Sequence, residues 1–226
     1  EILMGAKENV DKKRNYVDYA YKNLVMLSEW MMALPDDIEN WLAVACPKGK
    51  RVSMSTGDKI NSTTKLYYKN GMRFIEFKTN LPVHTILDCV YSEVNMTIYI
   101  LDVISYAGRD LLDCDTAFRF FWMKSKFLED DLKVIDTSNR NLKLNLLTNY
   151  SFTDHSTINE CFQTRPIFID GGELDGFLFY HSEGSYTSGE TPLVLWLFPF
   201  MLTEMFESFK INPDYNSLKP SEYTNF

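Results

Sequence analysis

One tryptophan near the carboxyl end of the chain is a candidate for binding chemistry. Trp196 lies in the stretch TPLVLWLFPF, residues 191–200, which contains two prolines and no charged residue. On a buried strand such an indole would belong to the core. An indole whose face stays open would instead stack on a flat molecule, most strongly on a cationic one, because the ring face is electron-rich. This stretch alone leaves both interpretations of Trp196 open.

A cluster of positive charge lies earlier in the chain, between Cys46 and Thr79. It holds eight basic residues against two acidic ones, whereas the whole chain has a net charge of -8. A basic surface on an acidic protein suits a small, highly charged anion better than a long nucleic acid, which must have many phosphates neutralised. The charge alone fits equally well the alternative that these residues form an ordinary solvated surface with no ligand. The basic residues are Lys48, Lys50, Arg51, Lys59, Lys65, Lys69, Arg73 and Lys78.

Metal and membrane signals are weak throughout the sequence. The four cysteines are scattered singly and have no histidine at ligand spacing, which argues against a structural zinc site. The longest apolar run, residues 191–201, is shorter than the roughly 18 to 20 residues that span a bilayer. We therefore expect no resident metal, no cofactor and no membrane partner.

The composition is that of one ordinary folded domain. The chain has 226 residues, 45% of them hydrophobic, which is enough for a single core. Residues 1–22 mix charges without an apolar period and are expected to form a leader outside the core. Residues 23–209 are expected to form the domain, and 210–226 a loose tail. Because the first residue is Glu1, the sequence leaves open whether the chain is a fragment.

The apolar spacing predicts mostly strands. Residues 24–31 have three- and four-residue spacing, which indicates a short helix or turn. An Asn-Gly pair within 64–78 is typical of a hairpin turn, and a second hairpin is expected across 84–106. The strands are expected at 41–47, 51–56, within 64–78, within 84–94 and 96–106, at 174–181 and at 191–198.

The remaining elements are helices. Residues 114–127 have a helical period with Asp113 or Asp115 as cap, and we expect Phe118, Phe121 and Trp122 to face inward. A polar stretch then runs to about residue 154, followed by a short helix near 157–163. This order predicts an α+β fold of antiparallel sheets with flanking helices.

Three strand segments resemble motifs of messenger-RNA capping enzymes and polynucleotide ligases. These segments are ILDCVYSEVNMTIYILDV, ELDGFLFYH and TPLVLWL, and CPKGKR at 46–51 takes the place of the K-x-D-G motif. In those enzymes the first lysine of K-x-D-G attacks the nucleotide phosphate, and here that position is Cys46. Lys48 and Lys50 are displaced by roughly 7 and 13 Å along an extended segment. Asp88 and Asp102 are then relics of the fold rather than metal ligands. The resemblance implies the enzyme fold with the transfer chemistry lost.

The chain resembles the snurportin family more closely. VMLSEW (25–30), CPKGKR (46–51) and residues 85–103, 114–126 and 175–197 occur in the family's order, and the resemblance spans about 24–205. It implies noncatalytic binding of the 2,2,7-trimethylguanosine cap of spliceosomal small nuclear RNAs.

The resemblance also implies the binding residues. Trp196 would stack on the cap base, Trp30 would contact the methyl groups, and Ser28 would hydrogen-bond the cap. Arg51 and Lys65 would meet the base and phosphates, and Lys59 is the alternative to Lys65. The full set of expected cap-binding residues is Trp196, Trp30, Ser28, Arg51, Lys65, Lys50, Leu27 and Cys46.

Partners follow from the same resemblance. A family member acts as an import adaptor for small nuclear ribonucleoproteins and shuttles between nucleus and cytoplasm with importin β and an exportin. Importin β binds an arginine-rich N-terminal segment. Residues 11–22 hold only Lys12, Lys13, Arg14 and Lys22, too few for that element.

Two other functions remain open from the sequence. The chain could be a diverged nucleotidyltransferase of the capping-enzyme type, which a lysyl-nucleotide adduct would reveal. It could also be a protein-interaction scaffold that has lost both functions, in which case a folded chain would bind no methylated cap.

Overall fold

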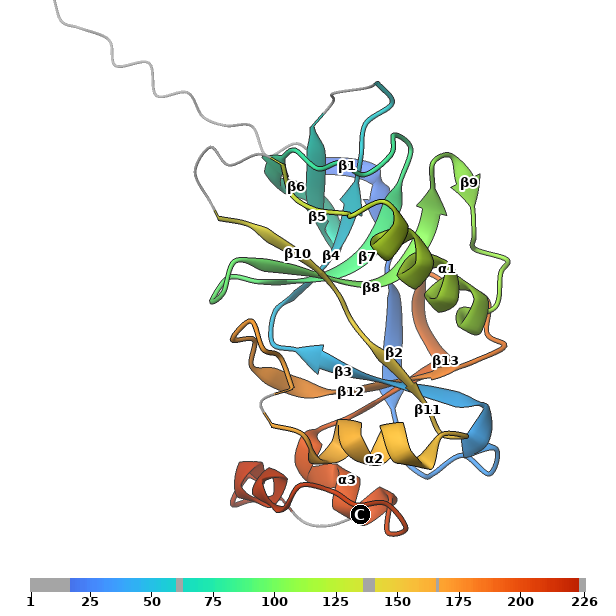
Figure 1. The fold of residues 1–226 in the computed structure, drawn as a ribbon, viewed down its shortest axis with the longest axis vertical. Coiled ribbons are helices and arrows are strands. Elements are labelled where there is room, and N and C mark those ends of the chain that lie inside the picture. The colour runs from blue at the N-terminus through green and yellow to red at the C-terminus, as the bar shows by residue number, and fades with distance from the viewer. Residues whose placement is uncertain (1–16, 60–62, 136–140, 166, 224–226) are drawn as a thin grey trace, which may run out of the picture.

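The structure, a computed structural model, describes residues 17–59, 63–135, 141–165 and 167–223. It contains an eight-stranded and a five-stranded sheet, stacked one above the other (Figure 1). The first sheet has the order β1-β6-β5-β4-β7-β8-β10, with β9 also paired to β8, and the second has the order β11-β3-β12-β13-β2. Most pairs are antiparallel, whereas β10 with β8 and β13 with β2 are parallel. The expected α+β class with antiparallel sheets is confirmed.

The elements have the following bounds. The strands are β1 Val17–Lys22, β2 Met26–Trp30, β3 Trp41–Pro47, β4 Lys50–Ser55, β5 Thr64–Tyr68, β6 Asn70–Phe77, β7 Ile86–Ser92, β8 Thr97–Tyr106, β9 Arg109–Asp110, β10 Lys143–Leu146, β11 Asn149–Ser151, β12 Leu174–His181 and β13 Gly189–Leu197. The helices are α1 Thr116–Glu129, α2 His155–Gln163 and α3 Leu202–Met205, with 3-10 turns η1 Ile38–Asn40, η2 Pro199–Met201 and η3 Pro213–Leu218.

Three layers of apolar side chains hold the sheets and helices together. Successive residues of a strand point to opposite faces, so a strand covered on both sides is apolar throughout. On β12, Leu178 and Tyr180 pack into the layer between the two sheets, while Phe177 and Phe179 pack under α2 and α3. On the outer face of the eight-stranded sheet, strand residues pack against Met123 of α1. Figure 1 shows α2 and α3 on the face of the five-stranded sheet that points away from the other sheet.

Segment 24–31 differs from the prediction of a helix or turn. Most of it forms strand β2, which pairs in parallel with β13. The paired residues of the two strands, from Met26 with Gly189 to Trp30 with Trp196, are more than 160 positions apart in the chain, so the hydrogen bonds that decide the conformation come from a distant partner. Tertiary pairing of this kind overrides local apolar spacing.

Helix α1 has its expected cap but not its expected buried face. The Asp115 carboxylate accepts a hydrogen bond from the Phe118 amide at 2.6 Å. Phe118 and Phe121 are 41% and 67% exposed, so the prediction that they face inward was wrong. Thr116, Arg119, Phe120 and Met123 are the buried residues. The buried face of the helix was predicted wrongly because it contains a charged residue, Arg119, which is paired with Asp102.

Several segments outside the expected core are ordered parts of the fold. Val17–Lys22 of the expected leader forms β1 and pairs with β6, whereas residues 1–16 lie outside the described ranges. The expected loose tail contains η3, in which Tyr215 is fully buried against the layer beneath the five-stranded sheet. The polar stretch before residue 154 supplies β10 and β11. The hairpins β5–β6 and β7–β8 and helix α2 follow the prediction.

Candidate functional site

A cleft of about 290 Å³ opens beside Trp196, where the layer between the two sheets reaches the surface. We call it the Trp196 cleft. It collects side chains from β2, β3, β4, β7, β12 and β13, so both sheets contribute walls. Its lining consists of Leu27, Ser28, Cys46, Pro47, Gly49, Arg51, Val90, Asp175, Leu178, Glu190 and Trp196. Five of the eight expected binding residues therefore meet here, namely Leu27, Ser28, Cys46, Arg51 and Trp196.

The turn from β3 to β4 carries the chain from one sheet to the other at the edge of the cleft. Gly49 lies against β7, where a Cβ would come 2.5 Å from the carbonyl oxygen of Tyr91. A larger residue would force the two strands apart, so glycine is required at this close approach. The turn thus brings Cys46 of β3 and Arg51 of β4 into the lining of the same cleft.

Trp196 is partly buried and lies across β12. It pairs with Leu178 in the sheet register, and its ring packs at the rim of the layer between the sheets. A Cβ on Gly176 would overlap the indole and would lie 2.5 Å from the carbonyl oxygen of Leu197. The glycine of the Asp-Gly pair therefore makes the space in which the indole rests. The ring is not enclosed, because it forms part of the cleft wall.

Trp30 stands outside the lining of the cleft. It is in register with Trp196 on the neighbouring strand, and its side chain is 51% exposed. The Phe198 ring contacts both indoles, with centroid distances of 5.4 Å to Trp30 and 6.2 Å to Trp196. The two tryptophans and Phe198 thus form an aromatic rim beside the cleft.

Arg51 is fixed in place by a buried carboxylate. Its Nε and Nη2 donate to the two oxygens of Asp88 at 2.6 and 2.8 Å, and Nη2 also donates to the carbonyl of Met26 at 2.9 Å. The Tyr186 hydroxyl donates to Asp88 at 2.6 Å and accepts from the Met26 amide at 2.9 Å. This bidentate pair holds β2 against β4 and β7 and so orients the residues at the cleft.

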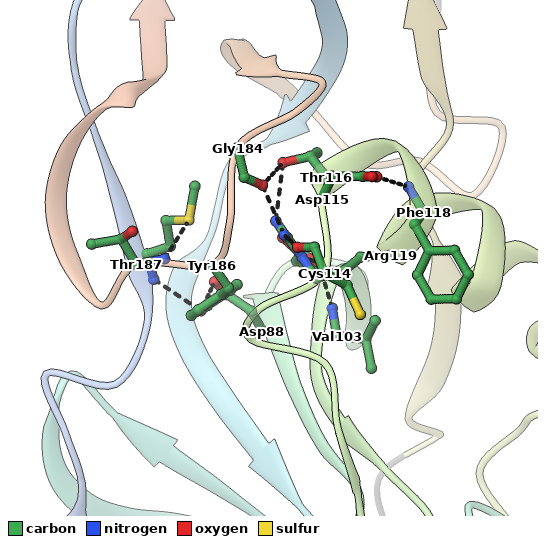
Figure 2. A network of polar contacts seen from close by, with 12 residues as sticks. Asp88, Val103, Cys114, Asp115, Thr116, Phe118, Arg119, Gly184, Tyr186 and Thr187 are labelled. Atoms are coloured by element: carbon green, nitrogen blue, oxygen red, sulfur yellow. Dashed lines mark hydrogen bonds and ion pairs between the residues drawn. The ribbon is translucent and has the colours of Figure 1, made fainter.

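A second arginine–aspartate pair is more completely buried than the first. Figure 2 shows its arginine, Arg119, beside Cys114 and Gly184. Arg119 of α1 donates to Asp102 at 3.0 and 2.9 Å, and both side chains are almost completely buried. It also donates to the carbonyl oxygens of Cys114 and Gly184. We call Arg51, Asp88, Tyr186, Arg119 and Asp102 the sheet junction. Asp88 and Asp102 each have an arginine partner, and among the described residues no cluster of His, Cys, Asp and Glu could hold a metal ion.

Four of the eight residues of the basic segment, among them Arg51, form ion pairs with carboxylates of the described residues. Lys48 pairs with Glu173 at 3.0 Å, and Lys50 pairs with Glu93 at 2.7 Å. Arg73 pairs with Glu76. Of the eight basic residues, Arg51 alone lines the Trp196 cleft as the structure describes it. Positive charge is therefore less concentrated beside the indole than the sequence suggested.

Lys65 and Lys59 are also not among the described residues that line the cleft. Lys65 lies on β5 opposite Ser55, at the far end of β4 from Arg51. Four strand residues correspond to roughly 13 Å. Lys59 precedes residues 60–62, which lie outside the described ranges.

Cys46 is buried and chemically quiet. Burial raises the pKa of its thiol to about 12, so the sulfur stays protonated at neutral pH. The neighbouring amines of Lys48 and Lys50 are held by Glu173 and Glu93. The position that corresponds to the catalytic lysine of the capping enzymes thus offers neither an amine nor a thiolate.

Asp175 is the functional candidate that the sequence analysis missed. Its partly buried carboxylate lines the cleft beside Trp196 and has no hydrogen bond or ion pair to any of the described residues. Burial raises the pKa of this carboxyl group, and Lys48 only partly offsets the effect. The Asp-Gly pair was visible in the sequence, but its lack of a partner was not. Glu190 is a second, exposed carboxylate in the lining.

A larger pocket of about 740 Å³ adjoins the cleft through Asp175. It is lined mainly by apolar residues of the C-terminal part, among them Phe198, Phe200 and Leu218. It lacks an indole face and a buried arginine, so the Trp196 cleft is the better candidate for a charged aromatic ligand. None of the helices within the described ranges combines the length and apolar character needed to cross a bilayer.

Comparison with known proteins gives a family match over most of the chain. The family model described as "Snurportin1, m3G cap-binding domain" matches residues 24–199. These bounds include the whole lining of the Trp196 cleft and Trp30. The resemblance stated from the sequence motifs is thereby confirmed.

Solved structures similar to this one include ligases. A chain described as Pmar-Lig_PreS3 has a TM-score of 0.52 at 12% identity, and the match covers 77% of this chain and 46% of that one. The ligase domain of M. tuberculosis LigD has a TM-score of 0.48 at 13% identity, covering 77% and 59%. Chlorella virus DNA ligase-adenylate has a TM-score of 0.47 at 12% identity, and the match covers 77% of this chain and 68% of that one. The chain spans less than two thirds of the length of the first two, and the likeness to Pmar-Lig_PreS3 concerns the fold.

Proposed function

The chain belongs to the family of snurportin m3G cap-binding domains, and from this membership we propose that it binds the 2,2,7-trimethylguanosine cap without catalysing a reaction. The observation that carries the proposal is the Trp196 indole, which forms a wall of an open cleft instead of being enclosed. Methylation at N7 makes the guanine ring cationic. A cation over an indole face gains about 0.5 to 2 kcal/mol, and base stacking contributes roughly 1 to 3 kcal/mol.

The remaining wall residues suit the other groups of the cap. Leu27 and the aromatic rim with Trp30 offer apolar surface to the two methyl groups on N2. Burying two methyls is worth about 1.6 kcal/mol at roughly 0.8 each. Ser28 offers a hydroxyl for a hydrogen bond to the base.

The cations are assigned to the triphosphate and the base edge. Arg51 is already held by Asp88, so its role is that of an oriented donor rather than a free charge. Lys50 lies outside the cleft and can leave Glu93, since both side chains are exposed. Lys65 is assigned to the phosphates furthest from the base. Cys46 contributes packing and, with its thiol protonated, no nucleophile.

Competition between trimethyl- and monomethyl-guanosine cap dinucleotides tests this function. The expected result is a preference for the trimethylated cap of somewhat over tenfold, the ratio that about 1.6 kcal/mol supports. Equal affinity for the two dinucleotides would reject the claim that apolar contacts select the N2 methyl groups. A folded chain that binds neither dinucleotide would favour the protein-interaction scaffold. Incubation with radiolabelled GTP or ATP is expected to leave no covalent adduct. A stable lysyl adduct would establish the nucleotidyltransferase alternative.

The cellular role that we propose is that of an import adaptor for small nuclear ribonucleoproteins. The adaptor would shuttle between cytoplasm and nucleus with importin β bound to an N-terminal segment and with an exportin for return. Family membership supports this role. Import of fluorescent trimethyl-capped RNA into nuclei of permeabilised cells tests it. Import should depend on the full-length protein and importin β and should fail when Trp196 is replaced by Ala.

A further inference from the structure

The charge balance of the Trp196 cleft is acidic. Arg51 is its positively charged lining residue, and the bidentate contact with Asp88 cancels that charge at 2.6 and 2.8 Å. Asp175 and Glu190 remain without a cation bound to them among the described residues. A cleft with two unpaired carboxylates favours a positively charged ligand over a neutral one.

Asp175 differs from the other carboxylates of this region in burial and partners. Glu173, two residues earlier, is exposed and binds the Lys48 amine at 3.0 Å. Glu190 is exposed, so water solvates its charge. Asp175 is partly buried, and Lys48 lowers the pKa of its carboxyl group without forming an ion pair with it. A charged group kept from water without a partner destabilises the folded chain and is typical of a binding site.

We propose that Asp175 is the counter-ion of the positively charged purine and determines the preference of the cleft for an N7-methylated base over a neutral one. This inference rests on the proposed cap binding and deepens it. Asp175 precedes Gly176, on which the Trp196 indole rests, so the carboxylate stands beside the platform on which the base would stack. The indole and the carboxylate then act on the same charge. Glu190 adds a weaker, solvent-screened attraction from the opposite strand.

Two dinucleotides that differ only in the N7 methyl group separate charge from shape. One is the 2,2,7-trimethylguanosine cap dinucleotide, and the other is its 2,2-dimethylguanosine counterpart, whose base is neutral. Calorimetric titration of the unaltered chain should show tighter binding of the first. Asp175→Asn should reduce the affinity for the trimethylated ligand on the order of tenfold, as expected of a partly buried charge interaction. The affinity for the neutral ligand should not change.

Matched variants identify the source of the effect. Glu207→Gln removes an exposed charge outside the cleft and should change neither affinity. Glu190→Gln should reduce the affinity for the trimethylated ligand less than Asp175→Asn does. Equal affinity of Asp175→Asn and the unaltered chain for the trimethylated ligand would overturn this inference alone, and so would an equal loss for both ligands. If the unaltered chain binds neither ligand, the proposed function fails and the inference falls with it.

Thermal unfolding gives a second test that a structural role would not pass. A carboxyl group whose pKa is raised on folding costs stability when ionised. This cost grows as pH rises from the unfolded value of 3.8 to the raised pKa of the folded state and is constant above it. Asp175→Asn should therefore raise the melting temperature at neutral pH while it lowers the affinity for the cap. A lower melting temperature would mean that Asp175 holds the fold together, and the counter-ion role would be rejected.

Discussion

The buried carboxylates of the sheet junction have arginine partners, whereas the partly buried carboxylate of the Trp196 cleft has none in the part of the chain that the structure describes. At the junction, Asp88 and Asp102 each receive two hydrogen bonds from an arginine. At the cleft, Asp175 is partly buried and has no partner among the described residues. The two regions share strands and lie close together through Arg51. The difference indicates that satisfied charges hold the sheets together, whereas the unsatisfied charge is the one that we propose as the counter-ion of a ligand.

The strongest way to break this contrast is to remove a partner at the junction. Arg119→Met leaves Asp102 buried without its cation, which typically costs 3 to 5 kcal/mol. Urea unfolding should show this loss at neutral pH. The double variant Arg119→Met with Asp102→Asn should recover part of it, because no charge then stays buried. An unfolding free energy unchanged in the single variant would contradict the structural role of the pair.

A smaller effect is expected where the cleft depends on a missing side chain. Gly176→Ala places a methyl group against the Trp196 indole and 2.5 Å from the Leu197 carbonyl oxygen. The overlap should cost about 1 to 3 kcal/mol in unfolding free energy and should also weaken cap binding, because the ring must move. Gly172→Ala serves as a control, since it crowds the Tyr99 hydroxyl away from the cleft. Cap affinity equal to that of the control would show that Gly176 does not position the indole.

The smallest effect on stability is expected at the exposed pair beside the cleft. Lys50→Gln removes the ion pair with Glu93, and the unfolding free energy should stay within about 0.5 kcal/mol. Cap affinity should fall at low salt and approach that of the unaltered chain at high salt, because exposed charges are screened. A salt-independent loss would point to a direct, desolvated contact instead.

Local signals sufficed to predict the hairpins and the class of the fold. The Asn-Gly pair, which begins β6 directly after the turn from β5, and the apolar run of β12 carry their own conformational preference. The strand β2 could not be predicted in this way, because its partner β13 is far away in the sequence. The phase of α1 was missed because Arg119 faces inward toward Asp102.

The site was predicted in part for similar reasons. The family motifs led to the expectation of five residues that the fold brings together in the cleft, namely Leu27, Ser28, Cys46, Arg51 and Trp196. Lys50 and Lys65 do not line it, since Lys50 pairs with Glu93 and Lys65 lies opposite Ser55, at the far end of β4 from Arg51. Asp175 was overlooked because the absence of a partner is a property of the packed structure and leaves no mark in the sequence.

Titration of a trimethylated cap dinucleotide against Trp196→Ala tests the central claim most directly. Calorimetry should show a loss of 1 kcal/mol or more, in the range of base stacking, relative to the unaltered chain. Trp122→Ala, which removes a partly buried indole on α1 outside the cleft, should retain the affinity. If Trp196→Ala remains folded and binds the cap as tightly as the unaltered chain, the indole is not the platform and the account is wrong.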